Sequence, residues 1–443
     1  MYLPPHVREC VDTLEAAGYS AWAVGGCVRD ACLGLTPHDY DLCTNALPEQ
    51  TEAVFAGYGL VLAGKKHGTV GVITGGEVVE ITTFRTEGDY KDNRHPEWVE
   101  FVPNIEQDLA RRDFTVNAMA WSPTRGFADP FGGREDLKNG VLRAVGSPYL
   151  RFTEDALRVL RGVRFAVRYH LTPEPETEQA MAVLAPRVRT LAKERIFSEL
   201  CQLLPLVTAG DLIRFAPVLA EVIPELKSAI GFDQRNPHHA FDLYTHIAHV
   251  VEGVPPQLPL RWAALLHDIG KVATFTLDDQ GCGHFYGHAQ ESAAMADRIL
   301  TDLKAPTALR EQVVFLIDKH MTRLEPDKKL LRRRLSQYGP DATYQLLALQ
   351  QADFGSKGQD EGDRVSWFDM IAGLLDSIRE EDSCLSLKDL AVNGHDILSL
   401  GYSGKAVGEC LNRLLDLVLD EQLPNEKEAL LQAAKDYQTR CSQ

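Results

Sequence analysis

The chain has 443 residues, of which 44% are hydrophobic, so it is long enough for about three globular domains with cores of their own. Its 63 acidic and 46 basic residues give a formal net charge of −17, which excludes binding of nucleic acid over the whole surface. No apolar run approaches the roughly 20 residues of a membrane helix, and Met1 to His6 lack the start of a signal peptide, which predicts a cytoplasmic protein without a membrane partner.

The first third of the chain mixes short β-rich runs with helical patterns. Ser20 to Val24 is β-rich, and two further runs, Gly68 to Thr74 and Val78 to Phe84, flank Gly75-Gly76. A two-residue glycine link between β-rich runs predicts a hairpin. The polar stretch Thr86 to Glu97 predicts a mobile loop that can act as a lid.

Beyond Pro148 the β pattern fades and amphipathic helical patterns follow, at Glu154 to Val167, Glu194 to Leu206, Leu260 to Ile269 and Ala293 to Leu303. We therefore expect an α+β protein with a small α/β head on an elongated all-helical neck, body and tail. The expected domains are the head at 1–145, the neck at 146–205, the body at 206–355 and the tail at 356–443.

The head combines flexible glycines with a pair of acids. Gly25-Gly26 follows an apolar run and leads into a helical pattern, so backbone amides at this turn can approach a phosphate closely. Asp39 and Asp41 flank one residue, and positions two apart on an extended strand point to the same face, where both carboxylates can bind one Mg²⁺. Glu80 is a candidate third carboxylate, although it can equally face solvent.

These residues resemble a known family. Ala23 to Asp30 and His38 to Asp41 resemble the class II tRNA nucleotidyltransferases, the CCA-adding enzymes, and their poly(A) polymerase relatives. Further matching segments are Arg111 to Ala120, Asp129 to Gly133, Glu154 to Arg158 and Lys193 to Ile196. The resemblance implies a Mg²⁺-dependent enzyme that extends tRNA 3′ ends from CTP and ATP. It implies that Asp39 and Asp41 bind the metal and that the nucleotide contacts Gly25, Gly26, Arg29, Arg112, Asp155, Arg158, Arg161 and Arg164.

Asp155 and Arg158 lie three apart, which places them side by side if Glu154 to Val167 is one helix. Cytosine and adenine both present an amino donor beside a ring-nitrogen acceptor, so Asp155 can accept from the first while Arg158 donates to the second. Uracil and guanine reverse this pattern and should be rejected. The alternative is an ordinary ion pair on the helix surface. The pair does not distinguish addition of CC, A or the full CCA.

A second set of ligand-type residues lies in the predicted body: His246, His267, Asp268, His288, His320 and Asp353. Leu265 to Lys271 resembles the central motif of the HD phosphohydrolase superfamily. The resemblance implies a metal site, and imidazole together with carboxylate suits a transition metal. The alternative is a degenerate domain that has kept the fold and only positions RNA.

Contacts with tRNA are expected at local basic runs, namely Arg158 to Arg168, Arg187 with Arg189, and Lys328 to Arg334, each of which can equally be a solvated helix face. Val392 to Asn425 resembles the family's C-terminal region, which suggests a tail that contacts tRNA. The leading hypothesis is therefore a tRNA nucleotidyltransferase of open oligomeric state. Its rivals are a poly(A) polymerase, an HD phosphohydrolase with a vestigial head, and a non-catalytic RNA-binding protein, which would be basic and lack the acid pair.

Overall fold

A computed structural model describes residues 1–87, 99–237, 240–356, 362–381 and 384–441. The chain divides into two compact units, of which unit 1 comprises residues 1–227 with 302–305 and unit 2 comprises 228–301 with 306–443. The predicted head and neck both fall in unit 1, and the division into four domains stays a prediction. Within the described ranges, no helix has the length and apolar character needed to cross a membrane. The expected lid lies almost wholly outside these ranges.

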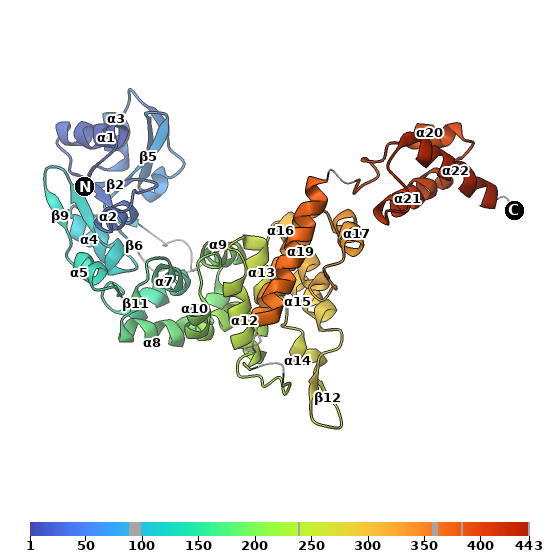
Figure 1. Ribbon diagram of the computed structural model, residues 1–443. Helices are drawn as coiled ribbons and strands as arrows, with labels where there is room; N and C mark the ends of the chain where they lie inside the picture. The colour runs from blue at the N-terminus through green and yellow to red at the C-terminus, as the bar shows by residue number, and fades with distance from the viewer. Residues whose placement is uncertain (88–98, 238–239, 357–361, 382–383, 442–443) are drawn as a thin grey trace. The chain divides into compact units, whose positions relative to one another are not determined.

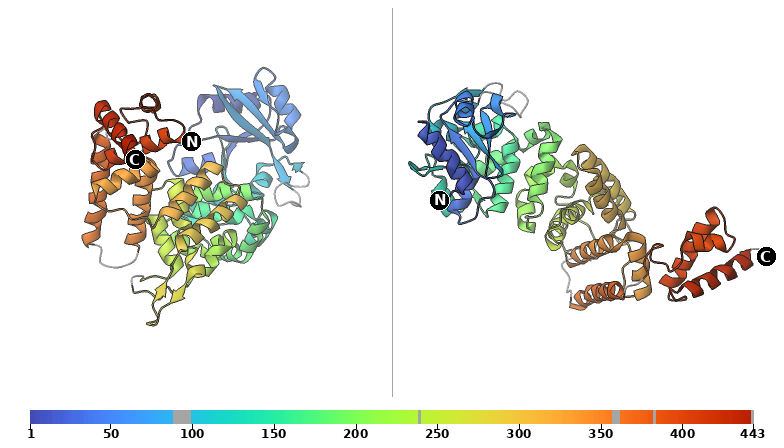
Figure 2. Two further views of the ribbon diagram at one scale, coloured as in Figure 1. Left: turned by 90° about the vertical axis from the view of Figure 1, so that its right-hand side faces the viewer. Right: turned by 90° about the horizontal axis from the view of Figure 1, so that it is seen from above.

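Unit 1 opens with a seven-stranded sheet in the order β3-β4-β5-β2-β1-β8-β9 (Figure 1). Its strands are β1 (Ala21–Val24), β2 (Asp41–Thr44), β3 (Gly59–Val61), β4 (Thr69–Thr74), β5 (Glu77–Thr83), β8 (Ala120–Ser122) and β9 (Gly126–Ala128). A separate antiparallel pair joins β6 (Arg85–Glu87) to β7 (Val99–Phe101). Helices α1 (Pro5–Ala16) and α3 (Pro48–Val54) pack on the sheet. Figure 2 shows the strands and helices of this unit, in blue and green, from two further sides.

The predicted hairpin is confirmed, because β4 and β5 pair in antiparallel register across Gly75 and Gly76. Both glycines have positive φ, +61° and +85°, which a tight two-residue turn requires and which side chains with a Cβ rarely adopt. Strand β5 also pairs with β2 in parallel, with Leu42 opposite Ile81. This register brings Asp41, at the start of β2, beside Glu80 of β5.

An apolar cluster attaches helix α4 (Ile105–Ala110) to the sheet. Trp22 and Val24 of β1 are buried together with Ile105 and Leu109 of α4. Helix α4 therefore has a fixed position, and the arginines that follow it, Arg111 and Arg112, start from an anchored backbone. The other short helices of this region are α2 (Gly26–Cys32), η1 (Lys65–His67), η2 (Thr115–Asn117) and α5 (Gly133–Lys138).

The rest of unit 1 is mostly helical, and α7 packs beside α9 while α6 packs beside α8. The elements are β10 (Val141–Leu142), α6 (Pro148–Glu154), α7 (Leu157–Arg168), β11 (Thr172–Pro173), α8 (Pro175–Leu184), η3 (Ala185–Thr190), α9 (Lys193–Leu203), α10 (Ala209–Arg214), α11 (Ala216–Val222) and η4 (Pro224–Ser228). The two-residue strands β10 and β11 pair in parallel.

The single helix expected over Glu154 to Val167 is wrong. Helix α6 ends at Glu154, Asp155 has extended backbone angles (φ −138°, ψ 106°), and α7 begins at Leu157. The Asp155 carboxylate accepts a hydrogen bond of 2.9 Å from the Leu157 N–H. Aspartate side chains that bond the backbone two residues on compete with the helix, and here this interaction interrupts it.

Unit 2 contains helices α12 to α22 and one short hairpin, β12 (Thr276–Leu277) with β13 (Gly283–His284). Its first helices are α12 (Leu243–Gly253), α13 (Leu258–Leu266), α14 (Lys271–Thr274), α15 (His288–Asp302), α16 (Thr307–Lys319), α17 (Lys328–Tyr338), α18 (Pro340–Gly355) and α19 (Gly362–Glu380). The chain ends with α20 (Gly394–Ser399), α21 (Lys405–Leu419) and α22 (Lys427–Cys441), which share a hydrophobic core of their own. The α+β class with its small sheet-containing head is confirmed.

Candidate active site and metal cluster

A polar cavity of about 420 Å³ in unit 1 collects most of the predicted head and neck residues. Its walls come from the turn after β1, the start of β2, the segment after α4, and the junction of α6 with α7. The lining residues are Gly25, Gly26, Arg29, Asp39, Asp41, Arg111, Arg112, Asp113, Asn117, Asp155, Leu157, Arg158, Arg161, Phe165 and Arg195.

Gly25 lines this cavity at a position where a residue with a side chain would not fit. Its φ of +69° lies in the left-handed region, and an added Cβ would lie only 2.8 Å from Nη1 of Arg112. The carbonyl of Gly25 accepts bonds from the N–H groups of Val28 and Arg29 as α2 begins. The turn therefore places the N-terminal end of α2 against the cavity, where backbone amides favour an anion.

The two acids that the sequence predicts as metal ligands, Asp39 and Asp41, both line the cavity. Desolvation in the cavity and repulsion by Asp39 and Glu80 raise the pKa of the Asp41 carboxyl, whereas Arg112 partly opposes the rise. An acid whose charged form is disfavoured by its neighbours has an excess of negative charge around it. A hard divalent cation with oxygen ligands would relieve that repulsion. The structure thus brings the candidate Glu80 close enough to affect the same carboxylate.

Arg112 is oriented by a buried acid beneath it. Its Nη2 donates a hydrogen bond of 3.3 Å to Asp108, and Arg111 donates to the other oxygen of the same carboxylate at 2.8 Å. Burial opposes ionisation of Asp108, but the two guanidinium groups hold its pKa below the usual value. The side chain of Arg112 is 20% exposed and is therefore held at the cavity wall while part of it stays accessible.

Asp155 and Arg158 reach the same cavity although they do not share a helix. Oδ2 of Asp155 accepts a hydrogen bond of 3.1 Å from Arg195 of α9. Arg158 is 7% exposed, forms an ion pair of 2.8 Å with Glu154, and donates to the carbonyl of Arg111 at 2.9 Å. Each side chain is held by fixed partners, several of which also line the cavity, and this makes the pair a preorganised set of one acceptor and one donor.

Arg161 and Arg164 have different surroundings. Arg161 lines the cavity and donates a bond of 2.8 Å to Asp113, whereas Arg164 is 6% exposed and bonds Glu199 of α9 at 2.6 Å. Among the described residues that line the cavity, Arg164 is not found. A step of three residues turns a helix by about 300°, so Arg164 lies about 120° around α7 from Arg158. Contact of Arg164 with nucleotide is therefore not supported by its position.

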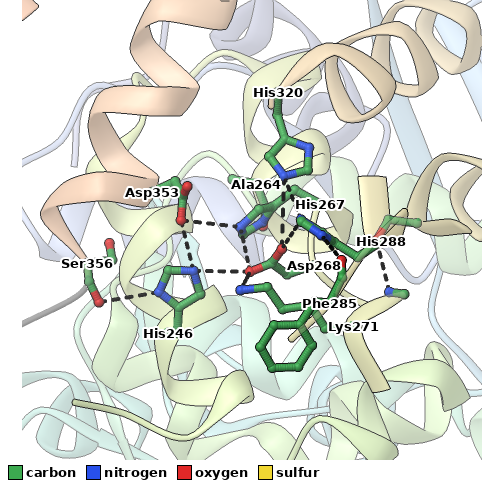
Figure 3. Close-up of polar contacts among 12 residues, drawn as sticks. His246, Ala264, His267, Asp268, Lys271, Phe285, His288, His320, Asp353 and Ser356 are labelled. Atoms are coloured by element: carbon green, nitrogen blue, oxygen red, sulfur yellow. Dashed lines mark hydrogen bonds and ion pairs between the residues drawn. The ribbon is translucent and has the colours of Figure 1, made fainter. Parts of the chain in front are cut away.

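The six ligand-type residues of the predicted body converge in unit 2 (Figure 3). They form two groups that share Asp268, one with His246, His267 and Asp353 and one with His288 and His320. Nε2 of His246 lies 3.2 Å from Oδ2 of Asp268 and 3.1 Å from Oδ1 of Asp353, and Nε2 of His288 lies 3.4 Å from Oδ1 of Asp268. Ligands about 2.1 Å from one metal lie about 3 to 4 Å apart, so these separations fit coordination.

Backbone carbonyls orient all four histidines of this cluster. In each histidine Nδ1 contacts one backbone carbonyl oxygen. His267 contacts Ala264 at 2.8 Å, His288 contacts Phe285 at 2.8 Å, His320 contacts Ile317 at 2.6 Å, and His246 contacts Ser356 at 3.3 Å. A carbonyl oxygen only accepts, so each Nδ1 carries the proton and each Nε2 is directed into the cluster. Metal-ligating histidines in proteins have this arrangement.

The charged groups of the cluster favour binding of a cation. Burial opposes protonation of His246, yet the bonds of Asp268 and Asp353 raise its pKa to about 9. Burial and the neighbouring His267 lower the pKa of His320 to about 4. Nζ of Lys271 lies 2.7 Å from Asp268 and 3.1 Å from Oε1 of Gln234, so a buried lysine also balances this carboxylate. The carboxylates thus favour a positive charge at His246, and a metal cation bound there would replace its proton, since imidazoles and carboxylates together suit a transition metal.

Three family models match parts of the chain. A poly(A) polymerase head domain matches residues 21–143, a probable RNA and SrmB-binding site of polymerase A matches 170–214, and a putative tRNA nucleotidyltransferase domain 2 matches 283–434. A CCA-adding enzyme of Streptococcus pneumoniae (strain CGSP14) is 33% identical over 438 residues, which are 97% of each chain. The chain belongs to the CCA-adding enzyme family.

Other CCA-adding enzymes support this assignment over nearly the full chain. One from Lactiplantibacillus plantarum is 32% identical over 440 residues, 97% of this chain and 95% of the relative. The crystal structure of the Bacillus stearothermophilus CCA-adding enzyme in complex with CTP superimposes with a TM-score of 0.73 at 26% identity and covers 99% of both chains. The predicted family and the predicted enzyme class, a tRNA nucleotidyltransferase, are confirmed. None of the three matched models is an HD domain, so that resemblance stays a prediction.

Several residues of this family member have contacts that the sequence reasoning did not assign. Asp113 and Asn117 lie in the matching segment Arg111 to Ala120, and Arg195 lies in Lys193 to Ile196, but the short motifs indicate no role for them. Tyr169 lies outside these motifs, although it bonds Arg29. Its only sequence signal is the four-residue spacing of Arg161, Phe165 and Tyr169, which places three side chains on one face of a helix.

Proposed function

We propose that this chain adds C and A nucleotides to the 3′ end of tRNA from CTP and ATP, with Mg²⁺ and release of pyrophosphate. The observation that carries the proposal is that one cavity contains the acid pair, the glycine turn and the Asp155–Arg158 pair. The first two features serve nucleotidyl transfer in general, and the third restricts the base. The names of the full-length relatives support the same activity.

In this proposal the triphosphate lies against Gly25, Gly26, Arg29 and Arg112. Asp39 and Asp41 hold Mg²⁺, and Glu80 adds negative charge beside Asp41. When bound, the metal would supply neutralisation of the phosphate charge and a lower pKa for the attacking hydroxyl. The tRNA 3′ oxygen forms a bond to the α-phosphorus while the bond to the leaving pyrophosphate breaks, so the chain needs no covalent intermediate.

Base selection would follow from fixed donors and acceptors. Each carboxylate oxygen has two lone-pair sites, so Asp155 can still accept from the amino group of cytosine or adenine while it holds Leu157 and Arg195. Arg158, held by Glu154 and the Arg111 carbonyl, donates to the adjacent ring nitrogen. Uracil and guanine would place a carbonyl against Asp155 and an N–H against Arg158. Each mismatch costs about 1–3 kcal/mol at a site shielded from water.

The decisive experiment uses tRNA transcripts that end before the tail, after one C, and after CC. Purified protein is incubated with each transcript and with CTP, ATP or both, and the products are sequenced at their 3′ ends. CTP incorporation contradicts a strict poly(A) polymerase, and the three acceptors separate CC, A and CCA addition. An Asp39→Ala and Asp41→Ala double variant controls for contaminating enzymes. Absence of any transfer by the wild-type protein would contradict the proposal.

Acceptor binding would use basic side chains outside the cavity. The run on α17 is strongly paired, since Lys328 lies 2.6 Å from Glu381 and Arg333 lies 2.8 Å from Asp420. Internal pairing lowers the net charge that this run offers to a phosphate backbone. We therefore favour the less heavily paired Arg187 and the exposed Arg168 as first candidates. The cytoplasm stays the predicted compartment.

A second candidate function is metal-dependent phosphate-ester hydrolysis at the cluster around Asp268. Two observations favour it: six ligand-type residues converge there, and backbone carbonyls orient the histidines through Nδ1. The test compares bound transition metal in wild-type protein, His267→Ala and a control, His249→Ala, whose imidazole packs on Phe241 outside the cluster. We expect metal loss only in His267→Ala, and equal metal content in all three would contradict the site.

Hydrolysis needs its own assay, because a metal site can be structural. Phosphomonoester and phosphodiester substrates are offered to the metal-loaded wild-type protein, to His267→Ala and to the Asp39→Ala, Asp41→Ala variant. Turnover that is lost in His267→Ala but kept in the head variant assigns the activity to the body. Turnover that survives in His267→Ala would contradict it.

A further inference from the structure

One face of α7 carries Arg161 and Phe165, which both line the cavity, and Tyr169 follows directly after the helix. The three residues follow one another at intervals of four, which aligns them on that face. Arg161 bonds Asp113, and the rings of Phe165 and Tyr169 lie 5.3 Å and 4.1 Å from the Arg29 guanidinium carbon. Such cation–π contacts add attraction where water is partly excluded.

Arg29 is held from several sides. Its Nη2 donates to the hydroxyl of Tyr169, its Nη1 donates to Oδ1 of Asn117 at 2.5 Å, and its Nε donates to Asp30 at 2.9 Å. The residue is only 6% exposed, yet it lines the cavity. A guanidinium has five N–H donors in one plane, so three partners at different corners fix both its position and its orientation.

The network closes back onto α7. Nδ2 of Asn117 donates to Asp113 at 3.1 Å, and Nη2 of Arg161 lies 2.7 Å from the same carboxylate. The polar contacts therefore form one continuous network, which runs from Tyr169 through Arg29, Asn117 and Asp113 to Arg161. Arg29 is the member of this network that lies on α2, the helix that follows the glycine turn.

We propose that Tyr169 is a positioning residue for the triphosphate, which acts by holding Arg29 toward the phosphates. The inference rests on the proposed nucleotidyl transfer, in which Arg29 contacts the triphosphate. Tyr169 does not itself line the cavity, so its hydroxyl acts on the nucleotide through Arg29. A loosened Arg29 weakens binding of every nucleoside triphosphate alike, because phosphates carry no base identity.

The test is Tyr169→Phe, which keeps the ring against Arg29 and removes only the hydroxyl. We expect the dissociation constants of CTP and ATP to rise together by about 10-fold, since a bond to a charged group is lost. Binding of CMP, which lacks the β- and γ-phosphates, and the preference for CTP over UTP should change less than about twofold. The matched control is Tyr58→Phe, which removes a hydroxyl that bonds Glu9 at 2.8 Å in the same unit.

A double variant tests the route of the effect. In an Arg29→Lys background, Tyr169→Phe should weaken CTP binding by less than about twofold, because the shared interaction is already lost. Full multiplication of the two effects would overturn the proposal, as would an equal loss of CMP and CTP binding or a Tyr169→Phe protein that binds CTP like wild type. Failure of the wild-type protein to bind CTP would instead contradict the proposed function.

Discussion

Arg195 of α9 donates a hydrogen bond of 3.1 Å to the carboxylate of Asp155, which lies between α6 and α7. Together with the bond from the Leu157 N–H, this contact holds the carboxylate from two directions and leaves it at the cavity wall. Asp155 thus has the fixed orientation that recognition of a base edge needs, although no helix supports it.

Asp155→Asn should reduce the preference for CTP over UTP. The amide can present an N–H where the carboxylate could only accept, so the mismatch with the uracil carbonyl is relieved. We expect the ratio of kcat/KM for CTP to that for UTP to fall by about 10-fold or more, which corresponds to about 1.4 kcal/mol. Single-nucleotide extension of a tRNA that lacks its tail measures both values, and an unchanged ratio would show that Asp155 does not read the base.

Asp41→Asn should abolish transfer without destabilising the fold. The pKa of Asp41 is raised by desolvation and by Asp39 and Glu80, so in the folded state its charge is unfavourable at neutral pH. Removing that charge leaves the melting temperature at or above the wild-type value, whereas transfer falls on the order of 1,000-fold through loss of a metal ligand. Differential scanning calorimetry measures the melting temperature and tRNA extension measures the transfer rate. A large drop in melting temperature would contradict our account of the charges.

Gly25→Ala and Gly34→Ala form a matched pair at the two ends of α2. Both glycines have positive φ, +69° and +73°, so both substitutions strain the backbone, and Gly25 also has a ψ of −122°, outside the left-handed helical region. Only at Gly25 does the new Cβ meet Arg112, at 2.8 Å, whereas nothing lies within 4 Å at Gly34. We expect both variants to lose stability, but only Gly25→Ala to bind CTP more weakly. Equal CTP affinity in the two variants would argue against this close approach.

Asp113 should contribute to the acid sensitivity of unit 1. Burial opposes its ionisation, but Arg161 and the bond from Asn117 lower its pKa to about 2, below the usual 3.8. An acid whose pKa is lower in the folded than in the unfolded protein stabilises the fold fully at a pH above its unfolded pKa. For Asp113 this contribution disappears as the pH falls from about 4 toward 2. The shift corresponds to about 2 kcal/mol at neutral pH.

The check on Asp113 is the unfolding free energy from hydrogen exchange of α7 amides in urea, compared between wild type and Asp113→Asn from pH 6 to pH 3. The difference should be about 2 kcal/mol at pH 6 and should shrink toward pH 3. Asp12→Asn, which removes an exposed pair with Arg8, should change stability by less than about 1 kcal/mol. A difference in unfolding free energy between wild type and Asp113→Asn that grows as the pH falls would contradict a lowered pKa of Asp113.

The sequence by itself determined the features whose chemistry repeats over a few residues. Gly75-Gly76 between two β-rich runs sufficed for the hairpin, because the turn requires positive φ at both positions. Gly25-Gly26 and the alternating acids Asp39 and Asp41 predicted a phosphate and metal site, and all four residues line one cavity. The family resemblance, also carried by short motifs, was confirmed by relatives that match nearly the whole chain.

Only the tertiary structure decided which distant side chains meet. Arg29 bonds Tyr169, 140 positions along the chain, and Arg164 bonds Glu199 instead of lining the cavity, although it continues the three-residue spacing of Arg158 and Arg161. The break at Asp155 came from one carboxylate that bonded the backbone and so overrode the helical pattern. Periodicity describes the face of one element, whereas contacts of this kind depend on how several elements pack, and packing brings together residues that no local spacing relates.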